Sequence, residues 1–260
     1  MNTISSLLEK IERAKELDFG TIFSESIELF KKTWLQGFLL WLFTLIVTFP
    51  LIIALYAPLF TLIIAQQNNG EIDPEAFNGF FAGMSVLYIV FVIVGIFVLG
   101  TITSALYAAF FRIMKKLDYG QEVATSDFFY FVKSKYLSKI FILMLIAYVI
   151  LIPSALLCYL PLLYTLVPLS FFAPIFAFNE ELGVSDIVKA SFKLGTKKWL
   201  IGLGLLIVSF LCYLVLGFIT CSIGWLFLRP FMYHPTYLIY KKVVGFEETS
   251  AIEEIGTSTE

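Results

Sequence analysis

The chain of 260 residues is too apolar for a protein that folds in water. Hydrophobic residues make up 59% of it and charged residues only 15%, with a mean hydropathy of +0.89. Soluble domains carry about 45–50% apolar and about 25% charged residues, so too few polar side chains remain here to cover a globular surface. The 18 basic and 20 acidic residues nearly balance, so net charge indicates no class of partner. These numbers exclude a water-soluble enzyme and indicate a lipid environment.

The uncharged stretches of the sequence set the expected number of membrane spans. A helix needs about 20 apolar residues to cross a hydrocarbon core of about 30 Å. The first two uncharged runs hold one span each, the third holds two, and the stretch 199–240 holds two more. The sequence therefore predicts an all-α, polytopic membrane protein with six transmembrane helices. The uncharged runs are 33–70, 76–111, 140–179 and 199–228, and 230–240 follows Arg229.

The first pair of spans is longer than the others. Apolar stretches around Pro50 and Pro58 and the acidic segment 68–76 account for the extra residues. A continuous helix of this length exceeds what a bilayer needs. We therefore expect spans one and two to protrude from the membrane or to bend at one of the two prolines.

Basic residues lie on one side of the predicted spans. They precede span one, lie between spans two and three and between spans four and five, and follow span six. The segment 66–78 between spans one and two carries only acidic charges, and the other two outer turns carry none. The positive-inside rule then places both termini in the cytoplasm, and we expect a bacterial inner membrane protein. The first 33 residues lack the apolar region of a cleavable signal peptide, so we expect span one to direct insertion.

A pattern of polar and special residues recurs along the chain. The pattern S-I-x-L-x-x-K-x-W-L-x-G at 26–37 returns as S-F-x-L-x-x-K-x-W-L-x-G at 191–202, and a weaker copy lies at 131–137. Glycines follow spans two, four and six at Gly120, Gly183 and Gly245. We interpret this as three hairpin repeats, each preceded by a short amphipathic helix at the cytoplasmic interface. The predicted organisation is a cytoplasmic segment 1–17, one membrane domain 18–245 with repeats 18–120, 121–183 and 184–245, and an acidic disordered cytoplasmic tail 246–260.

The short helix of each repeat carries lysines that can reach lipid headgroups. In the third repeat Ser185 is a candidate N-cap, and three lysines recur at i, i+4 and i+8 on one face. Such a helix can bind anionic lipid, or it can simply anchor the chain and set its topology. The candidate contacts to anionic lipid are Lys31, Lys32, Lys133, Lys135, Lys189, Lys193 and Lys197.

Few side chains in the predicted spans are ionisable or could serve as catalytic groups or metal ligands. Arg229 and the single histidine, His234, form a candidate intramembrane polar site in the last span. The alternatives are that Arg229 reaches the outer headgroups and that His234 is satisfied in the interior. No acidic residue falls in a predicted span, and the three cysteines form no CxxC motif. We therefore expect no catalytic residue, no metal and no cofactor. Cys158 and Cys221, both near outer turns, either pair in an oxidising compartment or act as small apolar residues.

Four short motifs in the second half of the chain resemble a known membrane module. They resemble the recurrent core of the membrane domain of bacterial glycerophosphodiester phosphodiesterases and its stand-alone six-span relatives, most closely over residues 168–210. The resemblance implies the membrane scaffold alone, because the phosphodiesterase activity belongs to a separate soluble domain with metal-binding carboxylates and histidines. The motifs are Ala173-Pro174, Glu181-x-Gly183, Ser191-x-x-Leu194 and Lys197-Lys198-Trp199.

Two classes of function remain. The first is a non-catalytic scaffold or lipid- and protein-interaction protein, with membrane lipids or another membrane protein as partners and neither nucleic acid nor a soluble substrate. The second is a transporter or permease-like carrier of a lipophilic or neutral solute, whose spans four and six are broken by prolines. Repeats of the same topology and the lack of a charged coupling residue favour the first class. The prolines in question are Pro168, Pro174, Pro230 and Pro235.

Overall fold

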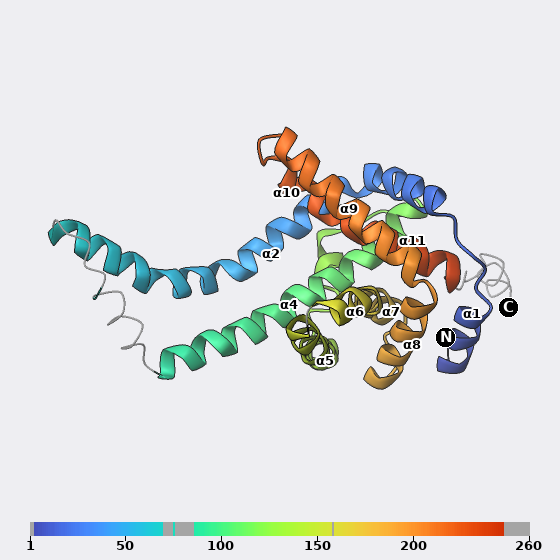
Figure 1. Ribbon diagram of the computed structural model, residues 1–260, viewed down its shortest axis with the longest axis horizontal. Helices are drawn as coiled ribbons and strands as arrows, with labels where there is room; N and C mark the ends of the chain where they lie inside the picture. The colour runs from blue at the N-terminus through green and yellow to red at the C-terminus, as the bar shows by residue number, and fades with distance from the viewer. Residues whose placement is uncertain (1–2, 70–74, 76–85, 158, 247–260) are drawn as a thin grey trace, which may run out of the picture.

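The computed structural model of the chain describes residues 3–69, 75, 86–157 and 159–246 (Figure 1). Every element in these ranges is a helix, and the ranges hold no strand. Within them, five helical stretches are long and apolar enough to cross a membrane. The chain is therefore an all-α protein with the helices of a multi-pass membrane protein. The five stretches are Phe19–Ile64, Tyr88–Asp118, Ser134–Leu156, Leu160–Phe178 and Trp199–Ile219.

Helices α2 (Phe19–Asn69) and α4 (Val86–Asp118) form a long hairpin that leaves the rest of the molecule, toward the left of Figure 1. At 1.5 Å per residue, α2 is about 75 Å long. It contains Pro50 and Pro58 without a break and follows a smooth curve. Apolar side chains on this hairpin, such as Phe60 and Val94, are exposed, as expected for helices surrounded by lipid. Most of the acidic segment 68–76 lies outside the described residues.

The three predicted interface helices take different forms. In the first predicted repeat the short helix and the span are one continuous helix, α2, which begins after Asp18. The Oδ1 atom of Asp18 caps α2 by accepting hydrogen bonds from the backbone N–H and the hydroxyl of Thr21, both at 2.7 Å. The second repeat has only a 3₁₀ turn, η1 (Thr125–Phe129). In the third, α8 (Val184–Lys197) has Gly183 rather than Ser185 at its N-cap.

The second hairpin ends in a broken helix. Helix α5 (Ser134–Leu156) leads into α6 (Leu160–Ser170), and α7 (Phe172–Phe178) follows after a break at Phe171. Proline has no N–H, so Pro174 cannot donate to the carbonyl of Ser170, four residues earlier. The Phe171 N–H bonds to the Pro168 carbonyl, three residues earlier, at 3.2 Å, and the Ser170 hydroxyl donates to the Val167 carbonyl at 2.7 Å. The break in span four that the prolines predict is thus present.

The third hairpin departs most from the predicted six spans. Helix α9 (Trp199–Ile219) is continuous, but the return segment consists of α10 (Gly224–Leu228), the 3₁₀ turn η2 (Arg229–Tyr233) and α11 (His234–Val243). Pro230 and Pro235 interrupt the backbone hydrogen bonds of an α-helix at two nearby points. The sixth predicted span is therefore not one continuous helix.

The most deeply buried part of the molecule surrounds the second half of α4. Ala105, Ala109 and Phe110 on this helix are fully buried, and the small alanines let neighbouring helices approach closely. Helix α7 and the turn η1 pack directly on it. At its end, Asp118 accepts hydrogen bonds from the Tyr237 hydroxyl at 2.9 Å and from Lys241 Nζ at 2.6 Å. These bonds tie α4 to α11.

A carboxylate ties η1 to the same helix. Asp127 accepts from Lys116 Nζ at 2.8 and 2.9 Å and from the Ala124 N–H at 2.9 Å. Burial alone would raise the pKa of Asp127, but the bonds to Lys116 and Ala124 and the nearby Arg112 outweigh it and lower the pKa. Because the folded-state pKa is lowered, the pair stabilises the fold above the unfolded pKa of about 3.9. This contribution is lost as the pH falls through the lowered value.

We predict that Asp127→Asn lowers stability above pH ~4 and removes part of the loss that follows acidification. The pair is partly exposed, so the expected effect is about 0.2–1 kcal/mol. Thermal unfolding midpoints of purified protein at neutral and acidic pH measure it. Glu122→Gln, a change at an exposed carboxylate in the same loop, is the matched control. If the unfolding midpoints of the two variants changed equally between neutral and acidic pH, the prediction would be contradicted.

Helix α8 meets the broken end of α6 with no side chain between the two backbones. A Cβ atom added at Gly195 would clash with the backbone Cα and N of Pro168. The Thr196 hydroxyl lies 2.7 Å from the Tyr164 hydroxyl, and Trp199 Nε1 donates to the Leu163 carbonyl at 3.4 Å. The glycine therefore fixes α8 against α6 just before the break.

We predict that Gly195→Ala destabilises the protein by about 1–3 kcal/mol, since the backbone at Pro168 must move to admit a methyl group. Loss of the folded state in detergent on heating, followed by tryptophan fluorescence, measures the effect. Gly20→Ala is the control, because the nearest atom to its added methyl is a carboxylate oxygen of Asp18 at 3.5 Å. A Gly195→Ala protein as stable as the Gly20→Ala protein would show that this close contact is not required.

Candidate functional site

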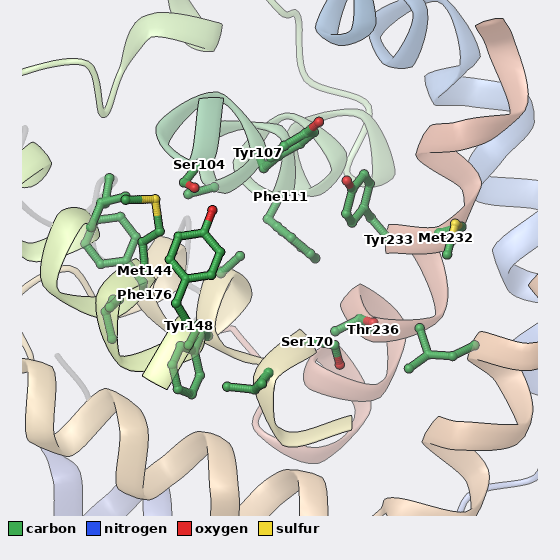
Figure 2. Close-up of a pocket in the computed structure, with 18 residues that line it drawn as sticks. Ser104, Tyr107, Phe111, Met144, Tyr148, Ser170, Phe176, Met232, Tyr233 and Thr236 are labelled. Atoms are coloured by element: carbon green, nitrogen blue, oxygen red, sulfur yellow. The ribbon is translucent and has the colours of Figure 1, made fainter. Parts of the chain in front are cut away.

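A cavity of about 400 Å³ lies among helices of all three hairpins (Figure 2). Its wall is formed by the middle of α4, by α5, by the junction of α6 and α7, by Leu206 of α9, and by η2 with the start of α11. Ligand sites in proteins commonly enclose about 300–1,000 Å³. The cavity is therefore large enough for a small molecule or for part of a lipid.

Both helix breaks border the cavity. Leu169, Ser170 and Phe172 line it from the break at Phe171, and Met232 and Tyr233 line it from η2. Interrupted helices within a membrane are tolerated where the irregular backbone is buried in protein or faces a cavity. The irregular backbone at both breaks thus borders the same cavity.

The lining is apolar apart from hydroxyl groups. No charged side chain lines the cavity among the described residues. The Ser104 and Ser170 hydroxyls donate to carbonyls of their own helices at 2.8 and 2.7 Å, which leaves their oxygen lone pairs available as acceptors. Figure 2 shows the hydroxyl-bearing side chains around the space. They are Ser104, Tyr107, Tyr148, Ser170, Tyr233 and Thr236.

Aromatic rings stiffen one wall. The rings of Tyr107 and Tyr233 lie 5.4 Å apart between centroids, and those of Phe111 and Tyr233 lie 6.0 Å apart. Such packing favours planar or extended apolar groups beside the rings. Tyr148 on α5 is 37% exposed, so the cavity borders the outer surface at this helix. Chemically, the site suits an uncharged lipophilic molecule with a few hydrogen-bonding groups, whereas a bare ion would lack a counter-charge.

His234 is a satisfied interior residue, as one of the two sequence alternatives expects. It is fully buried, its Nδ1 lies 3.1 Å from the Pro230 carbonyl, and its Nε2 lies 2.6 Å from the Thr33 hydroxyl. A carbonyl only accepts, so Nδ1 carries the proton, and Nε2 accepts from Thr33 in the neutral ring. The histidine therefore joins α2 to the broken return helix.

Arg229 does not share this environment. It begins η2, is exposed, and does not line the cavity. The two residues of the predicted intramembrane polar site are therefore in different surroundings: one faces outward and the other is enclosed by Phe30, Phe110 and Phe231.

The candidate lipid-binding lysines divide into three groups. Lys31, Lys135 and Lys193 form ion pairs with Glu28 at 2.6 Å, Glu181 at 3.4 Å and Glu12 at 2.8 Å. Lys133 lies 5.3 Å from the Tyr130 ring centroid, and Lys197 donates to the main-chain carbonyl of Glu12. Lys32 and Lys189 are exposed, and Lys32 borders a smaller hollow of about 270 Å³ with Asp118 and Lys241. Several of these lysines thus have partners within the chain.

Metal ligands and cysteines were also considered from the sequence. Groups of three or more His, Cys, Asp or Glu side chains that could hold a metal ion do not occur in them. Cys221 is exposed, but Cys158 lies outside the described residues, so their pairing stays a prediction. The sequence did not predict the cavity itself. The one signal for it was the set of prolines in spans four and six.

In comparisons with known proteins, the chain matches no family model, no curated protein and no solved structure. The resemblance to the membrane domain of glycerophosphodiester phosphodiesterases therefore stays a prediction.

We predict that Thr33→Val lowers stability by about 1–3 kcal/mol, because it leaves the buried Nε2 of His234 without a donor. Thermal unfolding in detergent measures the loss. Thr48→Val on the same helix is the matched control, since the Thr48 hydroxyl bonds to the carbonyls of Thr44 and Leu45 in its own helix. Equal midpoints for the two variants would show that the bond between Thr33 and His234 does not hold α2 to the return helix.

Proposed function

We propose that this chain is a multi-pass protein of a bacterial inner membrane that binds an uncharged lipophilic molecule inside its helical bundle and carries it without chemical change. The observation that carries the proposal is the largely apolar cavity, with a few hydroxyl groups, between two broken helices. Broken helices line the binding sites of many transporters. The absence of charged residues from the described lining matches a neutral ligand.

The contacts between hairpins fit an arrangement of three hairpin repeats around a common centre, which would support this role. Each outgoing helix packs on the return helix of the preceding repeat: α5 on α4, α9 on α6, and α2 on η2 and α11. Two equivalent glycines make these contacts. A Cβ at Gly202 would lie 2.7 Å from Val167, and a Cβ at Gly37 would lie 2.8 Å from Pro230. The return segments of all three proposed repeats line the cavity, which supports a common centre for them.

Six spans with both termini in the cytoplasm remain our topology for the chain. In this topology α10, η2 and α11 together form the sixth, interrupted span. The basic ends of α4, α8 and α11 and the positive-inside rule support the orientation. Helices α1 (Ile4–Glu12) and α11 are both seen at the right-hand end of Figure 1, whereas the end of α2 and the start of α4 lie at its left.

The second candidate is a non-catalytic scaffold that binds lipids or another membrane protein, the role that the sequence favours. Its specific support is the exposed Lys189 on α8 and the long, lipid-exposed α2–α4 hairpin. The ion pairs of Lys31 and Lys135 weaken it, because these lysines are already partnered. The resemblance to a phosphodiesterase membrane domain fits both roles, since it implies a scaffold without catalysis.

We predict that Ala147→Phe removes an uncharged lipophilic molecule that copurifies with the unmodified protein, because the ring fills the cavity from α5. The protein is extracted in polymer nanodiscs at low salt, and mass spectrometry of the organic extract measures ligand per chain. Val149→Phe is the matched control: it lies two residues along the same helix, is 71% exposed, and does not line the cavity.

The two variants separate the candidate functions. Loss of the ligand in Ala147→Phe but not in Val149→Phe supports the carrier. A preparation that holds only bulk lipid and a stoichiometric partner protein, unchanged by either substitution, would contradict the carrier and support the scaffold.

A further inference from the structure

The C-terminal end of α1 covers a basic face of α8. Lys193 Nζ donates to the Glu12 carboxylate at 2.8 Å, Lys197 Nζ donates to the main-chain carbonyl of Glu12, and Lys198 Nζ to that of Lys15. The apolar side of α1 is anchored by Leu7 and Ile11, which are both fully buried. The N-terminal helix and the segment after it are thus hydrogen-bonded to residues more than 180 positions later in the chain.

Two of the acceptors, the carbonyl and the carboxylate of Glu12, lie at the negative end of α1, and the Lys15 carbonyl lies in the segment that follows it. The last carbonyls of a helix lack partners within it and carry a partial negative charge. Together with the Glu12 carboxylate, they give the three ammonium groups an arrangement of acceptors that phosphate oxygens can replace. Lys189, one turn before Lys193 on the same face, is exposed and has no partner among the described residues.

Lys198 makes this face more than a patch of surface lysines. Its side chain is only 6% exposed, and an unpartnered ammonium group at such a position is strongly unfavourable. If α1 leaves together with the segment at Lys15, another anionic acceptor has to take its place. The Glu12 side chain, by contrast, is 73% exposed, so other anions at the surface can compete with it for Lys193.

The chain permits the exchange. Residues 14–18, between α1 and α2, have no helical structure, so α1 can move as a unit. A released α1 has an apolar side with which it can lie in the membrane interface.

We propose that the basic face formed by Lys189, Lys193, Lys197 and Lys198 binds the phosphate groups of anionic phospholipids, in exchange for the C-terminal end of α1. This site is separate from the cavity and does not depend on the carrier function. In a neutral membrane α1 stays docked, and in an anionic membrane the headgroups displace it.

Distance measurements between spin labels test the exchange. Labels are attached at Ser5→Cys on α1 and Ser185→Cys on α8, both exposed positions, in the full chain with Cys158, Cys212 and Cys221 changed to Ser. In phosphatidylcholine nanodiscs we expect one narrow distance distribution. In nanodiscs that also contain phosphatidylglycerol we expect a second population at longer distance.

Variants and a soluble probe sharpen the test. Glu12→Gln is expected to produce the long-distance population already in phosphatidylcholine. Glu9→Gln, the same charge change at an exposed residue of α1 whose ion pair is with Arg13 in its own segment, is not. Lys193→Gln with Lys197→Gln should abolish the difference between the two lipids. Inorganic phosphate in neutral nanodiscs should leave the distribution unchanged.

Two results would overturn the proposal. One is an unmodified protein whose distance distribution is the same in both lipids. The other is release of α1 by inorganic phosphate alone, which would assign the face to a soluble anion rather than to the membrane.

Discussion

Backbone hydrogen bonding is the constraint on which this structure depends. Lipid offers no partner to an exposed N–H or C=O group, so helices have to satisfy their own backbone, and breaks have to face protein. Prolines remove backbone donors at two places, near Phe171 and within η2. At each break a side chain donates a hydrogen bond to a backbone carbonyl. The Ser170 hydroxyl donates to the Val167 carbonyl, and Nδ1 of His234 donates to the Pro230 carbonyl. Both breaks face the interior, and the cavity lies between them.

The proposed ring of three hairpins explains why one cavity serves both breaks. In a ring, the return helices of the repeats face a common centre, and Gly37 and Gly202 allow outgoing helices to approach the breaks. The first repeat differs because α2 and α4 extend far beyond the others. Its return helix α4 is unbroken, and its buried alanines provide the surface on which the other helices pack. The continuous helix therefore supports the two interrupted ones.

Local sequence signals predicted much of the fold but little of the site. Uncharged runs between lysine clusters located α4, α5 and α9, because helix length and apolarity are properties of the segment alone. Span six was predicted from the apolar run and its break from Pro230 and Pro235, but the division into α10, η2 and α11 was not, because it depends on packing against other helices. The cavity could not be predicted, since Ser104, Tyr148 and Thr236 meet only after distant helices pack. The lysine row on α8 was visible as a helical face, but its partner Glu12 comes from the other end of the chain.

The most direct test of the central claim is a map of the protein in nanodiscs by electron cryomicroscopy, with a bound antibody fragment as a marker. We expect density for a bound molecule between α4, the break at Phe171 and η2, in contact with Ser104 and Thr236. We also expect no charged protein group beside it. Side chains that fill this space, or a continuous helix through Arg229–Tyr233 that closes it, would contradict the account.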